Sequence, residues 1–273
     1  MRVTAFLELM RPFNCLMAAL AVFLGYSLSI GSLQITAPVL LAMVSAFLIC
    51  GGGQAVNDYY DREIDARIKP HRPVPSGRVG AVEALMFSMF LFAVGVALSF
   101  LINHAALAIA SLTAFLLFVY SASLARLKFL GNFLVAGGTA LTFIYGASIS
   151  DNYALASFLF TNSFFANLAR EWSKDLEDLH GDIGRKTTLP MIIGQNTTAL
   201  AAIVALAVAV IAAFLPFTNG LLHKQTTLAL LAVSGALFAW MAFRLVKKDY
   251  AGASKWAKYA MLVALAAYVA ELV

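Results

Sequence analysis

The chain has 273 residues, of which 62% are hydrophobic and only 12% are charged, and its formal net charge is +5. Soluble domains carry about 25% charged residues, so this composition excludes an ordinary soluble protein. Several apolar runs reach the roughly 20 residues that a helix needs to cross a bilayer, which predicts an integral membrane protein with many spans.

The apolar runs predict nine spanning helices. In chain order, the expected ranges are 13–32, 38–59, 80–102, 105–122, 131–150, 153–172, 190–215, 226–246 and 256–272. Pro216 and Asn219-Gly220 are expected to close the seventh helix. The N-terminal apolar segment lacks a small-residue cleavage site, so it is interpreted as the first span. We therefore expect an all-α, polytopic membrane protein with one membrane-embedded domain over residues 1–273.

Basic residues gather on one side of the predicted bundle. When alternate loops of nine spans are assigned to opposite sides, 18 of the 19 Lys and Arg share the side of the N-terminus, and only Lys224 lies on the other. Cytoplasmic loops carry such an excess of Lys and Arg. The sequence thus predicts a cell-membrane protein with its N-terminus and long loops in a cytoplasmic polar cap and its C-terminus outside.

Acidic residues are concentrated in two short windows. Nine of the 14 Asp and Glu lie in Asp58–Asp65 and Glu171–Asp182. A run of charge is usually a solvated face. Here, however, the spacing within each window and the repetition between the windows both indicate a functional site.

The spacing of the first window predicts a metal site. Asp58, Asp61 and Asp65 are placed so that one continuous helix would carry them on one face. Stacked carboxylates repel one another, so the arrangement predicts bound cations. Carboxylate and amide oxygens favour a hard ion such as Mg²⁺. The two cysteines lie in apolar segments and the four histidines are scattered, so a Cys/His metal site is not expected.

The second window repeats the first. Asp175, Asp178 and Asp182 have the same spacing, and Asp175 follows Asp58 by 117 residues. Each acidic segment runs on into Lys and Arg. The two motifs, at 57–65 and 175–182, are therefore interpreted as belonging to pseudo-repeated halves that face one shared site.

A diphosphate explains why acidic and basic segments adjoin at a membrane surface. Mg²⁺ is typically held by a few carboxylates and by substrate phosphate oxygens. Arg and Lys then bind the remaining phosphate oxygens. Nine apolar helices imply a substrate with a long apolar tail. We therefore expect an isoprenoid diphosphate and a lipid-like acceptor as substrates, we expect no nucleic acid partner, and we infer no protein partner.

The two segments resemble the signature motifs of the UbiA superfamily of intramembrane prenyltransferases. The motifs read Asn57-Asp58-x-x-Asp61-x-x-x-Asp65 and Asp175-x-x-Asp178-x-x-x-Asp182. The resemblance covers nearly the whole chain, including their placement after the second and sixth helices and the RPFN segment (Arg11 to Asn14) that opens the first helix. It implies a UbiA-type bundle and Mg²⁺-dependent prenyl transfer with release of diphosphate.

The flanks of the motifs resemble one branch of this superfamily. RPVPSGR (Arg72 to Arg78) is similar to the branch of archaeal lipid enzymes and chlorophyll synthases. REWSKDLEDLHGDIGRKTTLP (Arg170 to Pro190) is similar to the digeranylgeranylglyceryl phosphate synthase family. That resemblance implies transfer of a geranylgeranyl group from geranylgeranyl diphosphate to the free hydroxyl of geranylgeranylglyceryl phosphate, which forms the second ether bond of archaeal membrane lipids.

The resemblance also implies roles for individual residues. The metal and diphosphate ligands would be Asn57, Asp61, Asp65, Asp175, Asp178 and Asp182, with Asp58 as a helper. Further contacts to the diphosphate are expected from Asn14, Arg67, Lys69, Tyr120, Ser121, Lys128 and Lys174. The acceptor's own phosphate needs other cations, for which the candidates are Arg72, Arg78, Arg185 and Lys186. Glu171 is a candidate catalytic base on its position alone.

Other interpretations of these features remain open. Lys128 could instead be one of the basic residues that set the membrane topology. Tyr120 could be an aromatic residue at the membrane interface, and Asn14 could be a helix cap. The alternative functions are a UbiA-type enzyme with an aromatic or tetrapyrrole acceptor, and a membrane transporter in which carboxylates mark an ion pathway. A purely structural membrane protein would leave the two acidic ladders unexplained.

Overall fold

A computed structural model describes residues 2–124, 127–182 and 186–273. Within these ranges every regular element is a helix and no strand is present. The chain divides into two compact units. The first unit holds residues 1–26, 34–125 and 145–151, and the second holds residues 27–33, 126–144 and 152–273.

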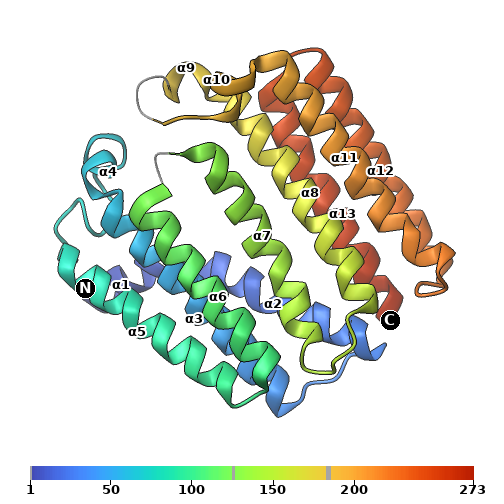
Figure 1. Cartoon of the computed structure of the whole chain (residues 1–273), viewed down its shortest axis with the longest axis horizontal. Coiled ribbons are helices and arrows are strands. Elements are labelled where there is room, and N and C mark those ends of the chain that lie inside the picture. Colours follow the sequence, from blue (N-terminus) through green and yellow to red (C-terminus); the bar gives the residue numbers. More distant parts are fainter. Residues whose placement is uncertain (1, 125–126, 183–185) are drawn as a thin grey trace. The chain divides into compact units, whose positions relative to one another are not determined.

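The first unit contains the helices of the N-terminal half (blue to green in Figure 1). Its elements are α1 (Arg2–Met10), α2 (Pro12–Ile30), α3 (Ala37–Tyr60), α4 (Arg62–Ile68), α5 (Ala81–Phe100), α6 (His104–Val119) and the π-helical turn η1 (Tyr120–Leu124). The last four residues of α2 fall in the second unit. Helix α3 packs against α5 and α6, and α1 packs against α3.

Glycines in α3 allow its close packing within the first unit. A β-carbon at Gly52 would lie 2.8 Å from Phe92 Cδ1 of α5, and one at Gly51 would lie 2.7 Å from Met10 Cε. The Ser88 hydroxyl of α5 donates to the Gly52 carbonyl at 2.8 Å. Small residues and interhelical hydrogen bonds are the usual means of joining helices in a membrane. The glycine run just before the first motif therefore contacts other helices of its own unit.

Polar side chains join residues 145–151 to the helices of the first unit. The Ser99 hydroxyl lies 2.7 Å from the Tyr145 hydroxyl, and Ser45 Oγ lies 2.9 Å from Ser99 Oγ. A β-carbon at Gly146 would collide with the Val22 carbonyl oxygen. These contacts join α2, α3 and α5 to residues 145–151.

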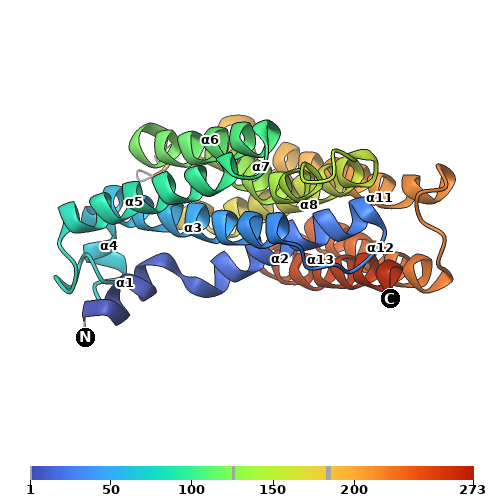
Figure 2. The same ribbon diagram turned by 90° about the horizontal axis from the view of Figure 1, so that it is seen from below.

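The second unit contains most of the C-terminal half of the chain (Figure 1). Its elements are α7 (Lys128–Ala147, as far as residue 144), α8 (Ala154–Glu177), α9 (Leu179–Asp182), α10 (Leu189–Ile193), α11 (Gln195–Thr218), α12 (Gln225–Val246) and α13 (Tyr250–Leu272). Helix α8 packs against α11 and α13, and α12 packs against α11 and α13. Figure 2 shows α12 and α13 running side by side.

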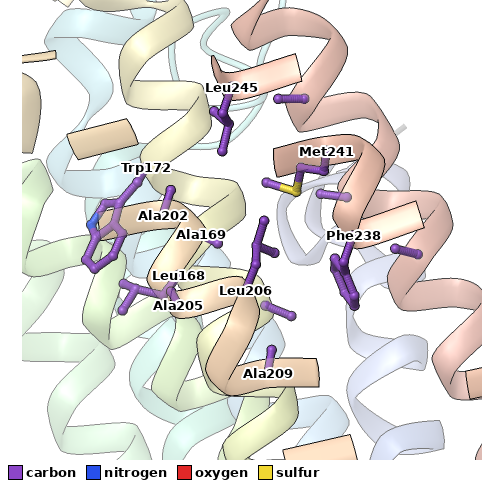
Figure 3. Packing of buried hydrophobic residues seen from close by; sticks show 14 of the residues in the cluster. Leu168, Ala169, Trp172, Ala202, Ala205, Leu206, Ala209, Phe238, Met241 and Leu245 are labelled. Carbon is purple, nitrogen blue, oxygen red and sulfur yellow. The ribbon is translucent and has the colours of Figure 1, made fainter. Parts of the chain in front are cut away.

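Alanine and large apolar side chains alternate in the core of the second unit (Figure 3). Leu168 of α8, Leu206 of α11 and Met241 of α12 are each at most 3% exposed. Ala205 and Ala209 let α11 approach its neighbours closely. The Asn162 side-chain amide of α8 donates to the Ala209 carbonyl at 2.8 Å, which satisfies a buried polar group between the helices.

Seven helices in the described part of the chain are long and apolar enough to cross a membrane. Their spans are Pro12–Ile30, Ala37–Tyr60, Ala81–Phe100, His104–Ala122, Lys128–Ala147, Gln195–Thr218 and Gln225–Val246. Each of the nine predicted segments overlaps a long helix. Helices α8 and α13 are not among the seven, and both carry charged side chains within the helix. By length and composition, seven of the nine predicted spans are therefore confirmed as helices that could cross a membrane.

Three predicted features of the helices were wrong. The first helix is preceded by a separate helix, α1, because the chain turns sharply at Arg11 with φ of 52°. The seventh predicted helix is divided into α10 and α11 at Gly194, whose φ is 83°. Pro216 lies inside α11 and does not end it. It is tolerated because the helix ends two residues later and the Pro216 carbonyl accepts from the Leu221 amide at 2.8 Å.

Candidate active site

The backbone of the first motif bends at its central aspartate. Helix α3 ends at Tyr60, Asp61 is its C-cap with φ of −83° and ψ of 1°, and α4 follows. The Asp61 amide still donates to the Asn57 carbonyl at 2.9 Å, and the Asp65 amide donates to the Asp61 carbonyl at 2.8 Å. The predicted single continuous helix for this motif is therefore wrong. Asp58 and Asp65 nevertheless stay on one side of the motif, since Arg72 Nη1 contacts both carboxylates.

Arg72 joins the first and last aspartates of this motif. Asp58 is 2% exposed and Asp65 is 6% exposed. Arg72 Nη1 lies 3.3 Å from Asp58 Oδ1 and also bonds to Asp65 Oδ2. Buried carboxylates are stable only when paired, so Arg72 is the counter-charge of both. The Asn57 side-chain amide, one residue before Asp58, donates to Asp61 Oδ2 at 3.2 Å.

Arg11 contacts the first motif, although the sequence interpretation gave it no role in the site and named it only as a basic residue and as part of the RPFN segment. Its Nη1 donates to Gln54 Oε1 and its Nη2 to Asp58 Oδ1, each at 2.5 Å. Asp58 therefore has two arginine partners. The sequence signal that could have identified Arg11 is a single basic residue beside a proline at the start of an apolar helix, in the RPFN segment.

The second motif has the same backbone path within the second unit. Helix α8 ends at Glu177, and Asp178 is its C-cap with φ of −87° and ψ of 2°. The Asp178 amide donates to the Lys174 carbonyl at 2.8 Å, and the Asp182 amide donates to the Asp178 carbonyl at 3.0 Å. The predicted continuous helix is wrong here too, although Asp175 and Asp182 stay on one side, since Lys128 Nζ contacts both.

Lys128 joins the first and last aspartates of the second motif. Asp175 is fully buried, and Lys128 Nζ lies 3.0 Å from its Oδ1. The same Nζ donates to Asp182 Oδ2 at 2.9 Å. Asn132, which the sequence interpretation missed, donates to Asp175 Oδ2 at 2.6 Å. Lys128 and Asn132 are four residues apart on α7, so they lie on one face of the helix. This spacing is the sequence signal that could have identified Asn132.

Glu171 lies between two cations. Its Oε1 accepts from Arg170 Nη1 at 2.7 Å, and its Oε2 lies 3.5 Å from Lys174 Nζ. The side chain is only 12% exposed. These contacts hold the Glu171 side chain in place on α8, four residues before Asp175.

The other predicted diphosphate ligands vary in their burial. Ser121 is 3% exposed and Tyr120 is half-buried, and both lie in the π-helical turn η1, a type of turn frequent at functional sites. Lys174 is half-buried beside Glu171. The exposed members are Asn14, Arg67 and Lys69. Asn14 lies within the first turn of α2 and is not its N-cap.

The predicted ligands of the acceptor phosphate have different partners. Arg78 is exposed and donates to both carboxylate oxygens of Glu8, at 2.6 and 2.9 Å, and to the His71 carbonyl. These bonds hold the pKa of the Glu8 carboxyl below its ordinary value. Arg72 is instead the counter-charge of the first motif. Lys186 is half-buried and its amide donates to the Asp182 carbonyl, whereas Arg185 lies outside the described residues.

The predicted metal ligands stay a prediction. Among the described residues, no group of three or more His, Cys, Asp or Glu side chains is placed to hold a metal ion. The predicted set, Asn57, Asp58, Asp61, Asp65, Asp175, Asp178 and Asp182, is divided between the two units. Its donors are carboxylate and amide oxygens, which suit Mg²⁺ chemically. In each motif, one cation, Arg72 or Lys128, contacts two of these aspartates.

Over most of its length, this chain is similar to proteins of one family. A model of the UbiA prenyltransferase family matches residues 18–266. The digeranylgeranylglyceryl phosphate synthase of Methanopyrus kandleri is 41% identical over 272 residues, which cover 98% of this chain and 99% of that protein. A solved structure concerned with digeranylgeranylglyceryl phosphate synthase is 32% identical, covers 98% of each chain and has a TM-score of 0.90.

A more distant solved structure shares the fold. It is a UbiA homolog from Archaeoglobus fulgidus bound to GPP and Mg²⁺, 19% identical, covering 95% of this chain and 99% of that chain with a TM-score of 0.71. The family model spans most of the chain, and the sequence relationship holds over nearly its full length. The chain therefore belongs to the UbiA prenyltransferase family.

Proposed function

We propose that this chain transfers a geranylgeranyl group from geranylgeranyl diphosphate to the free hydroxyl of geranylgeranylglyceryl phosphate, forming the second ether bond of archaeal membrane lipids and releasing diphosphate. The observation that carries the proposal is the 41% identity to the Methanopyrus kandleri synthase over almost the whole of both chains. The two buried carboxylate–cation clusters support the same reaction class.

The proposal includes an orientation in the membrane. All nine long helices cross the bilayer, with the N-terminus and both motifs on the cytoplasmic side and the C-terminus outside. The support is the distribution of basic residues, 18 of 19 on one side. Helices α8 and α13 are then spans whose charged residues face protein or the interface. Accessibility of single cysteines placed at Gly77 and Gly220 to a membrane-impermeant thiol reagent tests this orientation, since the two should react from opposite sides.

The two motifs hold the diphosphate in this mechanism. Mg²⁺ bound to the oxygens of Asp61, Asp65, Asp178 and Asp182, with Asn57, Asp58 and Asp175 in support, would neutralise charge on the departing diphosphate. Arg72 and Lys128, which now bridge aspartates, lie where they can bind phosphate oxygens instead. The exposed Arg67 and Lys69 would add cationic contacts from the cytoplasmic side.

The chemistry at carbon follows from these contacts. The C1–O bond of the donor breaks, and its electron pair leaves with the diphosphate. The acceptor hydroxyl oxygen then forms the new bond to C1 and loses its proton. Glu171, which contacts Arg170 and Lys174, is our candidate for receiving that proton. The apolar helices would keep water from the allylic cation.

One assay tests the reaction against its alternatives. The purified full chain receives geranylgeranyl diphosphate and Mg²⁺ with geranylgeranylglyceryl phosphate, an aromatic acid or a tetrapyrrole as the acceptor. We expect a prenylated product and released diphosphate only with geranylgeranylglyceryl phosphate. Product with another acceptor alone would assign the enzyme to a different UbiA branch. Omitting Mg²⁺ should abolish product, and restored activity on its addition tests the metal.

A further inference from the structure

A pocket in the second unit lies where α12 meets α13, apart from both motifs in the sequence. It is open, has a volume of about 500 Å³, and is lined by Arg244, Gly252, Lys255, Trp256 and Tyr259. None of these residues is used in the proposed prenyl transfer. Helices α12 and α13 pack along each other, so the pocket belongs to a well-supported junction (Figures 1 and 2).

The Arg244 guanidinium is fixed in place at this pocket. Arg244 Nη2 forms an ion pair with Asp249, and Asp249 Oδ1 also accepts from the Gly252 amide at 3.0 Å to cap α13. The guanidinium lies close to Gly252, where a β-carbon would force it to shift. The Arg244 side chain is 33% exposed, so it is not closed off from the pocket. A cation held in place by Asp249 and partly open to the pocket is suited to an anionic ligand.

The surrounding charge is strongly positive. Asp249 is the single acidic residue between positions 240 and 260. The same stretch holds five basic residues, which are Arg244, Lys247, Lys248, Lys255 and Lys258. Asp249 is already paired with Arg244, so the remaining lysines have no acidic counterpart nearby in the sequence. The local field therefore attracts anions.

Aromatic rings place the pocket at the depth of lipid headgroups. The Trp256 and Tyr259 rings lie 5.6 Å apart in an edge-to-face arrangement on the pocket wall. Trp and Tyr are enriched at the membrane–water interface, where one end is apolar and the other is wet. Helix α12 is among the helices that are long and apolar enough to span the membrane, and Arg244 lies in its last turn.

We propose that this pocket binds the phosphate of an anionic membrane lipid. Arg244 and Lys255 contact the phosphate oxygens, and Trp256 and Tyr259 pack against the glycerol and upper chain. A bilayer lipid is favoured over a soluble anion because the rings join the cationic wall to the apolar surface of α12 and α13. The site is distinct from the prenyl-transfer site, so either proposal can fail without the other.

Lipid binding to the purified full chain tests the proposal. Native mass spectrometry in one detergent would compare dioleoyl phosphatidic acid with dioleoyl phosphatidylcholine, neither of which has the free hydroxyl of an acceptor. We expect phosphatidic acid to bind more tightly, and Lys255→Ala to weaken it about fivefold, the effect of one interfacial charge. Lys255 is exposed, so its removal should leave the fold intact. Trp256→Ala should also weaken binding.

Lys247→Ala is the matched control. Lys247 is an exposed lysine of the same segment that does not line the pocket, and its Nζ lies 5.7 Å from the Phe243 ring centroid. Its loss should change phosphatidic acid binding by less than about twofold because solvent and salt screen it. Equal losses for Lys247→Ala and Lys255→Ala would reduce the site to a non-specific basic patch. Equal affinity for both lipids, or displacement of phosphatidic acid by equimolar inorganic phosphate, would also overturn the proposal.

Discussion

The two aspartate motifs follow the same backbone path, one in each unit. Helices α3 and α8 both have 24 residues and begin and end 117 positions apart. Each ends at an aspartate C-cap with nearly the same dihedral angles. The amide-to-carbonyl bonds of Asp61, Asp65 and Lys69 recur at Asp178, Asp182 and Lys186. The local scaffold is therefore repeated, which is what the predicted pseudo-repeat requires at these two places.

The counter-charges of the two motifs are not repeated. In the first unit Arg72 comes from the loop that follows the motif, and Arg11 supplies a second guanidinium to Asp58. In the second unit Lys128 comes from the preceding helix, and Asp175 has a neutral amide, Asn132, as its other partner. Among the described residues, the first motif thus has two cations and the second has one. The comparison indicates that the backbone of the motif fixes the carboxylates, whereas their partners come from whichever element lies nearby.

The largest expected effect tests whether the repeated aspartates form one site. Asp61→Asn and Asp178→Asn should each lower diphosphate release by about 100-fold or more, because each would remove a charged ligand of the proposed metal. If the motifs act as a unit, the double variant should lose little more than either single variant. Steady-state assays with geranylgeranyl diphosphate and Mg²⁺ measure all three.

Glu177→Gln provides the control for those variants. Glu177 is exposed and adjoins Asp178, yet it has no place in the predicted ligand set. It should retain most of the activity. If the losses in the double variant multiplied, the two motifs would act separately, and the shared-site interpretation of the repeat would fail.

The difference in counter-charges predicts unequal costs of removing them. Lys128→Met leaves the fully buried Asp175 without a cation, which should lower the free energy of unfolding by about 3 kcal/mol. Arg11→Met leaves Asp58 paired with Arg72, so the loss should be nearer to about 1.5 kcal/mol. Unfolding in one detergent, followed for both variants, measures the difference.

Neutralising the carboxylate that has lost its cation should restore stability only in the second motif. Asp175→Asn added to Lys128→Met should recover much of the lost stability, because a neutral amide is cheaper to bury than an unpaired charge. Asp58→Asn added to Arg11→Met should recover little, because Arg72 would then lose a partner. Equal losses and equal recoveries in the two units would show that the second arginine gives no redundancy.

Two glycines, one in each unit, differ in how tightly they are packed. Gly52→Ala in α3 would place a β-carbon 2.8 Å from Phe92 Cδ1 and 3.2 Å from the Ser88 carbonyl oxygen, so it should destabilise the protein by about 1–3 kcal/mol. Gly181→Ala in α9 meets nothing within 4 Å and should be neutral within about 0.5 kcal/mol. Thermal unfolding of the two variants compares them directly, and a neutral Gly52→Ala would show that α3 and α5 separate easily.

The positions of the helices and motifs followed from local patterns, whereas the partners of the aspartates did not. Apolar runs located every long helix, because hydrophobic length is a local property of the chain. Arg11 and Asp58 are 47 residues apart, and Asn132 and Asp175 are 43 residues apart. No period in the sequence connects such positions. They meet only because separate helices pack together.

The breaks at Asp61 and Asp178 were also missed, for a different reason. A spacing of i, i+3, i+7 was read as a continuous helix. The backbone instead leaves helical geometry at the central aspartate and resumes in α4 and α9. A short polar side chain favours such caps and turns. The same residue type that indicates a metal ligand thus also indicates a helix end, and the pattern alone does not separate the two.

The smallest expected effect concerns the loops that follow the two motifs. In the first unit, Glu8 and Arg78 form an exposed ion pair that holds the loop after α4 against α1. In the second unit, the Phe129 amide donates to the Thr187 carbonyl at 3.3 Å, a bond that does not titrate. Acid should therefore loosen the first loop and leave the second unchanged.

The direction follows from the lowered pKa of Glu8. A carboxyl with a lower pKa in the folded state contributes stability above its unfolded pKa, and that contribution is lost as the pH falls through the lower pKa of the folded state. Amide hydrogen exchange of peptides 70–79 and 186–190, corrected for the intrinsic effect of pH, measures both loops. Glu8→Gln should loosen residues 70–79 already at neutral pH and remove their acid dependence. The effect should be small because exposed ion pairs contribute little, and loosening of both loops in acid would indicate a general response of the protein rather than this pair.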